Sequence, residues 1–205
     1  SDDVLKKFNN VSWKESIIKI HKATNIVTYN SDYYRRLAYD EILATFLISS
    51  QVRKKITKVK KKIKQFNLKK YNDVIYNLNY ELTNDQINTL REINKDIGSE
   101  YKMFRLVQGD VGSGKTIVSL LSALNVIEAG YQVAFMAPTE ILANQHYKLA
   151  KELLGKYLTI ELITGQTKSL VKKKIQIEIK KKKIDLIIGT HSLFQKKMIF
   201  NNLGL

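Results

Sequence analysis

The residues with the clearest chemical character form one short glycine-rich segment in the middle of the chain. Residues 109–116 match the phosphate-loop pattern G-x-x-x-x-G-K-[ST] and lie between an apolar run and a helical pattern. Glycines let the backbone turn so that successive N–H groups face a phosphate, and the following helix directs its positive end at the same anion. The predicted nucleotide-binding residues are Gly109, Asp110, Val111, Gly112, Ser113, Gly114, Lys115 and Thr116.

Two of these residues carry the expected catalytic chemistry. Lys115 is expected to neutralise phosphate oxygens, and the Thr116 hydroxyl is expected to bind Mg²⁺. A glycine-rich turn without function would explain neither the Lys-Thr pair nor its position after the last glycine.

Gln86 is a second candidate, and it has two possible roles. Thr83 to Gln86 fit a capping box in which Thr83 is the N-cap and Gln86 is residue N3. A glutamine amide also offers the paired donor and acceptor that the edge of an adenine requires. Both roles are compatible, because a capped helix end would hold the amide in place.

Three threonine-containing turns follow apolar runs farther along the chain. They are Thr139, Thr164 and Thr190. Each alone also fits a helix cap or a simple turn. In an open parallel sheet, however, the carboxyl ends of the strands share the edge where ligands bind. Three hydroxyls at that edge could contact a sugar-phosphate backbone without reading its sequence.

The elements that must position these residues alternate between short apolar runs and helical patterns, as in a parallel sheet with crossover helices. The last helix also has isoleucines at a strand period, but a parallel crossover needs a covering element there. The predicted strands are Met103–Gln108, Gln132–Ala137, Leu158–Ile163 and Asp185–Ile188, and the predicted helices are Asn84–Ile97, Gly114–Ala129, Glu140–Leu154 and Leu170–Lys182.

The N-terminal part has a different sequence pattern. Residues 31–66 lack Gly and Pro and have apolar residues at helical spacing, which predicts one long helix or two abutting helices. Residues 67–81 are rich in asparagine and read as a connection. We therefore predict a helical segment over residues 1–78 and the nucleotide-binding lobe over 79–205. Basic residues between 53 and 64 either meet phosphates or form a solvated face: Arg53, Lys54, Lys55, Lys58, Lys60, Lys61, Lys62 and Lys64.

Composition favours a polyanionic partner. The formal charge of +16 must be solvated, screened or matched, so nucleic acid is the first partner to consider, although a lysine-rich composition could also arise without selection. The chain has no cysteine, hence no disulfide partner and no thiolate metal site. It shows neither a signal peptide nor an apolar run of about 18 residues. These features predict a cytoplasmic protein without a membrane partner. The sequence ends after an apolar run without a polar or basic tail, which suggests an internal fragment.

Four stretches resemble the superfamily 2 helicase core, and within it the bacterial RecG branch-migration helicases. They are residues 105–116 (RLVQGDVGSGKT), 136–146 (MAPTEILANQH), 162–168 (LITGQTK) and 187–195 (IIGTHSLFQ). The upstream RLAYDEIL at residues 36–43 also looks like the helix that precedes the motor in that family.

The resemblance implies a RecA-like first motor lobe, here incomplete, that uses ATP and Mg²⁺ and acts on branched DNA such as stalled forks and Holliday junctions, at the bacterial nucleoid. It assigns adenine recognition to Gln86 and DNA contact to Thr139, Gln145, Thr164, Thr190 and His191. From its surroundings in the sequence alone, His191, like His146, fits a structural role as well.

Other interpretations remain open. The transcription-repair coupling factor is similar in the same stretches, but it commonly has Tyr at the position of Ser113 and V-P-T-T where residues 137–140 read A-P-T-E. A P-loop ATPase or nucleotide kinase unrelated to DNA, or a basic nucleic-acid-binding module with a nucleotide switch, would share the phosphate loop. Tyr80 also departs from the family's Phe and Pro before Leu-Thr, which leaves the stacking partner of the adenine open.

The resemblance further implies an acidic motif of the form D-E-x-H, which this sequence lacks, and an arginine finger on a second lobe. Both are expected beyond residue 205. The 205-residue chain alone is therefore expected to show no DNA-stimulated hydrolysis.

Overall fold

The computed structural model describes residues 6–8, 11–22, 28–57, 59–194 and 198–205 of the chain. It divides into two compact units, residues 1–59 and 60–205. Residues 60–76 pack on the rest of the second unit. The boundary of the nucleotide-binding lobe at residue 79 stays a prediction. None of the described helices is both long enough and apolar enough to cross a membrane.

The first unit consists mainly of two helices, α2 (Trp13–His21) and α3 (Asp32–Thr57). Ser12 caps α2 by accepting a hydrogen bond from the Glu15 amide. Phe8 packs against Tyr39 of α3 with ring centroids 5.4 Å apart. Farther along α3, apolar side chains such as Phe46 are exposed.

The predicted helix does not continue to residue 66. It ends at Thr57, and residues 59–66 run without helical structure. The Lys61 ammonium donates to the Ile97 and Ser99 carbonyls, so it satisfies acceptors at the end of another helix. Lys64 lies 4.8 Å from the ring centroid of Tyr131. Arg53, Lys54 and Lys55 lie in α3, whereas Lys60, Lys61, Lys62 and Lys64 follow the end of this helix, so the predicted basic residues do not share one helical face. Lys58 lies outside the described residues.

The predicted connection at residues 67–81 contains helix α4 (Lys69–Tyr76). Val74 is buried, and Tyr71, Ile75 and Leu78 pack against the main core. Their spacing of three and four residues is the helical pattern that the neighbouring asparagines obscured.

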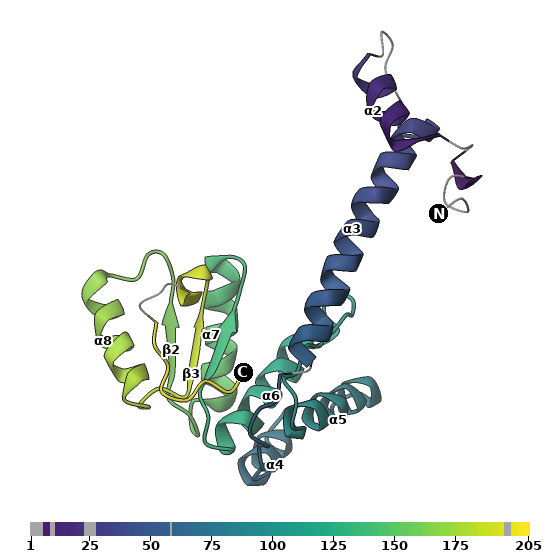
Figure 1. Ribbon diagram of the computed structural model, residues 1–205. Coiled ribbons are helices and arrows are strands. Elements are labelled where there is room, and N and C mark those ends of the chain that lie inside the picture. Colours follow the sequence, from purple (N-terminus) through teal and green to yellow (C-terminus); the bar gives the residue numbers. More distant parts are fainter. Residues whose placement is uncertain (1–5, 9–10, 23–27, 58, 195–197) are drawn as a thin grey trace. The chain divides into compact units, whose positions relative to one another are not determined.

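The second unit is built around a three-stranded parallel sheet with the order β1-β3-β2 (Figure 1). The strands are β1 (Val133–Met136), β2 (Ile160–Ile163) and β3 (Leu186–Gly189), and the helices after α4 are α5 (Asn84–Gly98), α6 (Lys115–Glu128), α7 (Glu140–Leu154) and α8 (Ser169–Lys180). A 3₁₀ turn, His191–Phe194, follows β3. The predicted α/β class and all four predicted helices of this unit are confirmed.

Both faces of the sheet are covered. Leu186 and Ile188 of the central strand belong to the core that includes α6 and α7, whereas Ile187 belongs to a second core with Ile175 and Ile179 of α8. Successive strand residues point to opposite faces, so α7 and α8 lie on opposite sides of the sheet (Figure 1). This explains why β3 is buried throughout and reads as an uninterrupted apolar run.

Residues 103–108 do not form the strand that we predicted. In the described part of the chain no strand pairs with it, and Phe104 and Leu106 are exposed. A cavity of about 310 Å³ is lined by Met103 and Val107 on one side and by Val133 and Phe135 of β1 on the other. The apolar pattern is present, but a β-strand also requires a hydrogen-bonding neighbour.

A buried glutamine joins β1 to the end of the chain. Gln132 Nε2 donates to the Ile179 and Ile184 carbonyls at 3.0 and 2.8 Å. Its Oε1 accepts from the Asn201 and Asn202 amides at 3.0 and 3.2 Å. All four hydrogen bonds of the amide are thus made inside the protein. Residues 202–205 then run along the outer edge of β1, where the Ala134 amide donates to the Leu205 carbonyl.

Candidate phosphate-binding site

The glycine-rich segment forms a tight loop that leads directly into α6. Gly112 and Gly114 have positive φ angles of 85° and 79°, which side-chain-bearing residues rarely adopt. At Gly112 a Cβ would meet open space, whereas at Gly114 it would lie 2.3 Å from Gln86 Nε2. The loop therefore needs Gly112 for its backbone angle alone, and Gly114 for both its angle and its close approach to Gln86.

The first turn of α6 is arranged for an anion. Its N-cap is Gly114, which offers no side-chain acceptor, and its first turn contains no acidic residue. The initial N–H groups of a helix have no partner within the helix, and the helix dipole adds positive charge there. A phosphate group would satisfy these donors.

Lys115 lies at the same place. Its ammonium donates to the Gly109 carbonyl at 2.8 Å and to the Asp110 carbonyl at 2.5 Å. It also approaches the Ser113 hydroxyl at 3.4 Å. The charged group is therefore held over the loop, and the next residue, Thr116, is half-buried in the first turn of α6.

Gln86 connects helix α5 to this loop. The capping box is present: Gln86 Oε1 accepts from the Thr83 amide at 3.0 Å, and Thr83 Oγ1 accepts from the Gln86 amide at 3.3 Å. Gln86 Nε2 also donates to the Ser113 carbonyl at 3.0 Å. These bonds use one of the two side-chain N–H donors and one of the two oxygen lone pairs, so one donor and one acceptor remain.

The predicted DNA-contacting residues follow the carboxyl ends of the strands, except Gln145, which lies in the second turn of α7. Thr139 is the N-cap of α7, and its hydroxyl accepts from the Leu142 amide at 3.3 Å. Thr164 follows β2 and Thr190 follows β3, and both are buried, with 6% and 8% exposure. Gln145 and His191 are exposed. Within the described residues, no hydrogen bond links this group to the phosphate loop; Gln195, at the end of the fourth motif, lies outside them.

Glu140 is a residue of this edge that the sequence did not single out. Its Oε1 accepts from the Gln166 amide at 3.2 Å, and a Cβ at Gly165 would lie 2.8 Å from the same oxygen. The carboxylate thereby ties the start of α7 to the turn after β2.

His146 packs against an aromatic side chain. Its ring packs against Phe135 with centroids 5.2 Å apart. Burial lowers the pKa of His146 below its ordinary value, because the charged form loses hydration. No group of three or more His, Asp or Glu side chains able to hold a metal ion occurs among the residues that the structure describes.

Residues 83–205 match the family model described as DEAD/DEAH box helicase. The chain belongs to the DEAD/DEAH box helicase family. Its relatives within this helicase family include the ATP-dependent DNA helicase RecG of Aquifex aeolicus, 37% identical over 99% of this chain, and that of Thermotoga maritima, 43% identical over 83% of it. The matched residues make up 26% and 22% of those two helicases.

A solved structure described as RecG bound to a three-way DNA junction has a TM-score of 0.73 and 38% identity, and it matches 99% of this chain. The match covers 28% of that longer chain. The predicted resemblance to RecG helicases is thereby confirmed, as is the RecA-like α/β class. This helicase-family chain spans about a quarter of the length of the relatives that it matches.

Proposed function

We propose that this chain carries the nucleotide-binding part of an ATP-dependent DNA helicase that acts on branched DNA. The main support is the phosphate loop, in which two left-handed glycines, an α6 N-terminus without a side-chain cap and Lys115 converge. The similarity to RecG helicases supports the wider activity, substrate and partner. Action on DNA would place the protein in the cytoplasm, at the nucleoid of a bacterial cell.

The loop is suited to binding and charge stabilisation. The backbone N–H groups at the start of α6 would bind phosphate oxygens, and Lys115 would exchange its contacts with the Gly109 and Asp110 carbonyls for contacts with those oxygens. Mg²⁺ would supply neutralisation of the charge that develops on the phosphates. Thr116 is the ligand that this loop would offer to the ion, together with the phosphates themselves.

Gln86 would recognise the base. One N–H donor and one oxygen lone pair of the Gln86 amide are not used by its contacts with Thr83 and Ser113. They match the acceptor and the donor that the edge of an adenine offers. Because the amide is already fixed at both of its atoms, recognition would cost little side-chain entropy. Tyr80 lines a separate cavity of about 780 Å³ next to α5 and has no role in this proposal.

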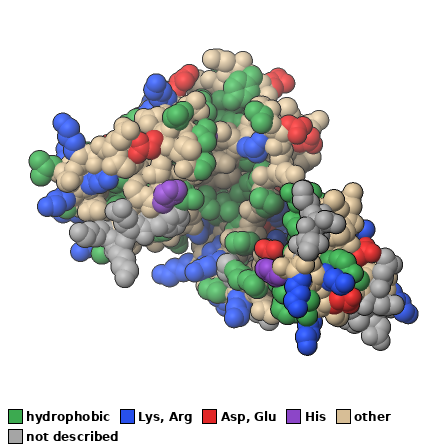
Figure 2. Space-filling view, turned by 90° about the horizontal axis from the view of Figure 1, so that it is seen from above, with side chains coloured by type: hydrophobic (Ala, Val, Ile, Leu, Met, Phe, Trp, Pro, Cys, Tyr) green, Lys and Arg blue, Asp and Glu red, His purple; other side chains and the backbone are tan. Residues whose placement is uncertain are grey.

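DNA contact would be made near the carboxyl edge of the sheet, where His191 is exposed and Thr139 caps α7, and by Gln145, which is exposed in the second turn of α7. Thr164 and Thr190 are buried, so these two turns would contribute by holding their exposed neighbours. On the face shown in Figure 2, lysine and arginine side chains are dispersed among acidic, hydrophobic and other side chains. Dispersed charge favours weak binding to phosphates without sequence preference.

The decisive test is nucleotide binding by the wild-type chain and by Lys115→Ala, measured by calorimetry with MgADP. Losing charge-assisted contacts should weaken binding about 10- to 100-fold. The free energy of unfolding should change little, because Lys115 is the first residue of α6 and is not part of the buried core. Lys148→Ala, at an exposed position of α7, is the matched control. Equal affinity of wild type and Lys115→Ala would refute the assignment.

A further inference from the structure

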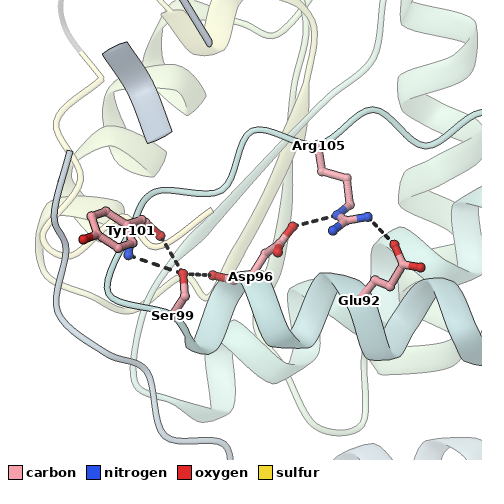
Figure 3. Close-up of polar contacts among 5 residues, drawn as sticks. All are labelled: Glu92, Asp96, Ser99, Tyr101 and Arg105. Carbon is pink, nitrogen blue, oxygen red and sulfur yellow. Dashed lines mark hydrogen bonds and ion pairs between the residues drawn. The ribbon is translucent and has the colours of Figure 1, made fainter. Parts of the chain in front are cut away.

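Arg105 bridges two acidic side chains on one face of α5 (Figure 3). Its Nε donates to Asp96 Oδ2 at 2.7 Å, and its Nη1 donates to Glu92 Oε2. Glu92 and Asp96 are four residues apart, so they lie next to each other on the helix surface. The hydrogen bond to Asp96 is the main reason that the pKa of Arg105 is raised above its ordinary value.

A second contact fixes the start of the same segment. The Ser99 hydroxyl donates to the Asp96 carbonyl at 2.8 Å and accepts from the Tyr101 amide at 3.3 Å (Figure 3). The chain thus turns back at the end of α5 and returns along it towards the phosphate loop.

Arg105 is the polar side-chain anchor of this returning segment, beside the apolar packing of Met103 and Val107. Within the described residues, no backbone hydrogen bond joins residues 102–108 to another segment. Gly109 follows Arg105 by four residues, a reach of at most about 14 Å even when fully extended. The place where Arg105 is held on α5 therefore limits where the phosphate loop can begin.

The same helix also holds the far side of the loop. Gln86 lies in the first turn of α5 and donates to the Ser113 carbonyl. Helix α5 thus contacts the loop directly through Gln86 and anchors the segment that enters it through Arg105.

We propose that Arg105 is a positioning residue that sets the distance between the base-recognising Gln86 and the phosphate loop. The inference rests on the proposed nucleotide-binding function. One nucleotide must meet Gln86 with its base and the loop with its phosphates, and the Arg105 ion pairs keep these two groups in register. A ligand that consists of phosphates alone does not need this register.

The test compares MgADP with magnesium pyrophosphate as ligands of the 205-residue chain. In Arg105→Ala, affinity for MgADP should fall about 10-fold, because small displacements between binding groups are costly. Affinity for pyrophosphate should stay within about twofold, since the loop and Lys115 are intact. The ratio of the two affinities is the readout, and a general loss of stability would not change it selectively.

Variants on the helix side provide an independent approach. The pair Glu92→Gln with Asp96→Asn leaves Arg105 in place and should lower the same ratio. Arg105→Lys retains a cation that can reach one acid, so an intermediate ratio is expected. Lys102→Ala, at an exposed position on the same segment, is the control and should leave the ratio unchanged.

The outcomes separate the two proposals. Binding of MgADP that does not depend on Lys115 would refute the nucleotide site itself. Lys115-dependent binding with an unchanged ratio in Arg105→Ala and in the Glu92→Gln, Asp96→Asn pair would overturn the role of Arg105 alone. The role would also be overturned if Arg105→Ala, Arg105→Lys and the Glu92→Gln, Asp96→Asn pair each lost the same factor of affinity for MgADP and for pyrophosphate. Arg105 would then act on the phosphate loop itself and not on the register between the loop and α5.

Discussion

The side-chain amide of Gln86 is hydrogen-bonded to the phosphate loop, because its Nε2 donates to the Ser113 carbonyl at 3.0 Å. The same side chain completes the capping box of α5 through Oε1. One residue therefore serves both the stability of a helix and the position of the loop, and substitutions can separate the two contributions.

Gln86→Glu should separate them most clearly. A glutamate at this position can still accept from the Thr83 amide, as in the usual capping box, but it cannot donate to the Ser113 carbonyl. Stability should therefore stay within about 0.5 kcal/mol of wild type, while MgADP affinity falls about 10-fold. Gln86→Ala should lose about 1 kcal/mol of stability as well. Urea unfolding and calorimetry measure the two effects; wild-type MgADP binding by Gln86→Glu would contradict the proposed contact.

Substitutions of Gly112 and Gly114, the two glycines with positive φ angles, should differ in how much unfolding free energy they cost. Gly112→Ala should cost about 1 kcal/mol of unfolding free energy, from its backbone angle alone. Gly114→Ala should cost about 1 to 3 kcal/mol more, because the new Cβ would overlap Gln86 Nε2. Adding Gln86→Ala to Gly114→Ala should restore part of this loss. Equal costs for the two glycine variants would show that the approach of Gln86 to Gly114 is not tight in solution.

The pKa of His146 predicts a pH dependence of stability. Because burial lowers this pKa in the folded state, the unfolded chain takes up a proton first as the pH falls below about 6.5. Stability should therefore be highest above neutral pH and decline towards pH 5. His146→Gln should show a smaller decline, measured as melting temperature at pH 7.5 and 5.5. His191→Gln, at an exposed position, is the control; a decline unaltered by His146→Gln would exclude this histidine as the cause.

DNA binding should follow the exposure of the side chains at the sheet edge. Gln145→Ala should lower the affinity for a three-way junction about 2- to 10-fold, the range for one lost hydrogen bond. Thr164→Val should leave the affinity unchanged, because Thr164 is only 6% exposed. Fluorescence anisotropy at two or more salt concentrations would measure both. The logarithm of affinity should fall with the logarithm of salt at a slope of about −0.9 per phosphate contacted. A salt-independent affinity, or a strong effect of Thr164→Val alone, would argue against this surface.

The sequence predicts the local structure of the phosphate loop and its helices well. Its predictions are wrong where contacts between residues far apart in the chain determine the structure. The phosphate loop, helices α5 to α8 and the capping box follow from residues close together in the chain. Residues 59–66 also have apolar spacing suited to a helix, but Lys61 instead donates to carbonyls of α5. No local pattern in the sequence shows that this lysine will bind the carbonyls at the end of another helix.

The segment before the loop gives the complementary case. Met103, Arg105 and Val107 alternate with Phe104 and Leu106 as in a strand, and the alternation is real: the first three face the cavity and α5. What determines whether such a segment is a strand is the chain beside it. Among the candidate site residues, Arg105 and Glu140 were missed for a related reason, since their partners lie on other elements.

The four hydrogen bonds of Gln132 have a consequence for the behaviour of the protein in concentrated solution. They hold residues 201 and 202, from which the chain continues along the outer edge of β1. An uncovered strand edge offers backbone donors and acceptors to any other extended chain and is a common starting point for aggregation. Loosening Gln132 would expose that edge while most of the core stays packed. The first sign of damage at this residue would then be intermolecular association of nearly native molecules, ahead of unfolding.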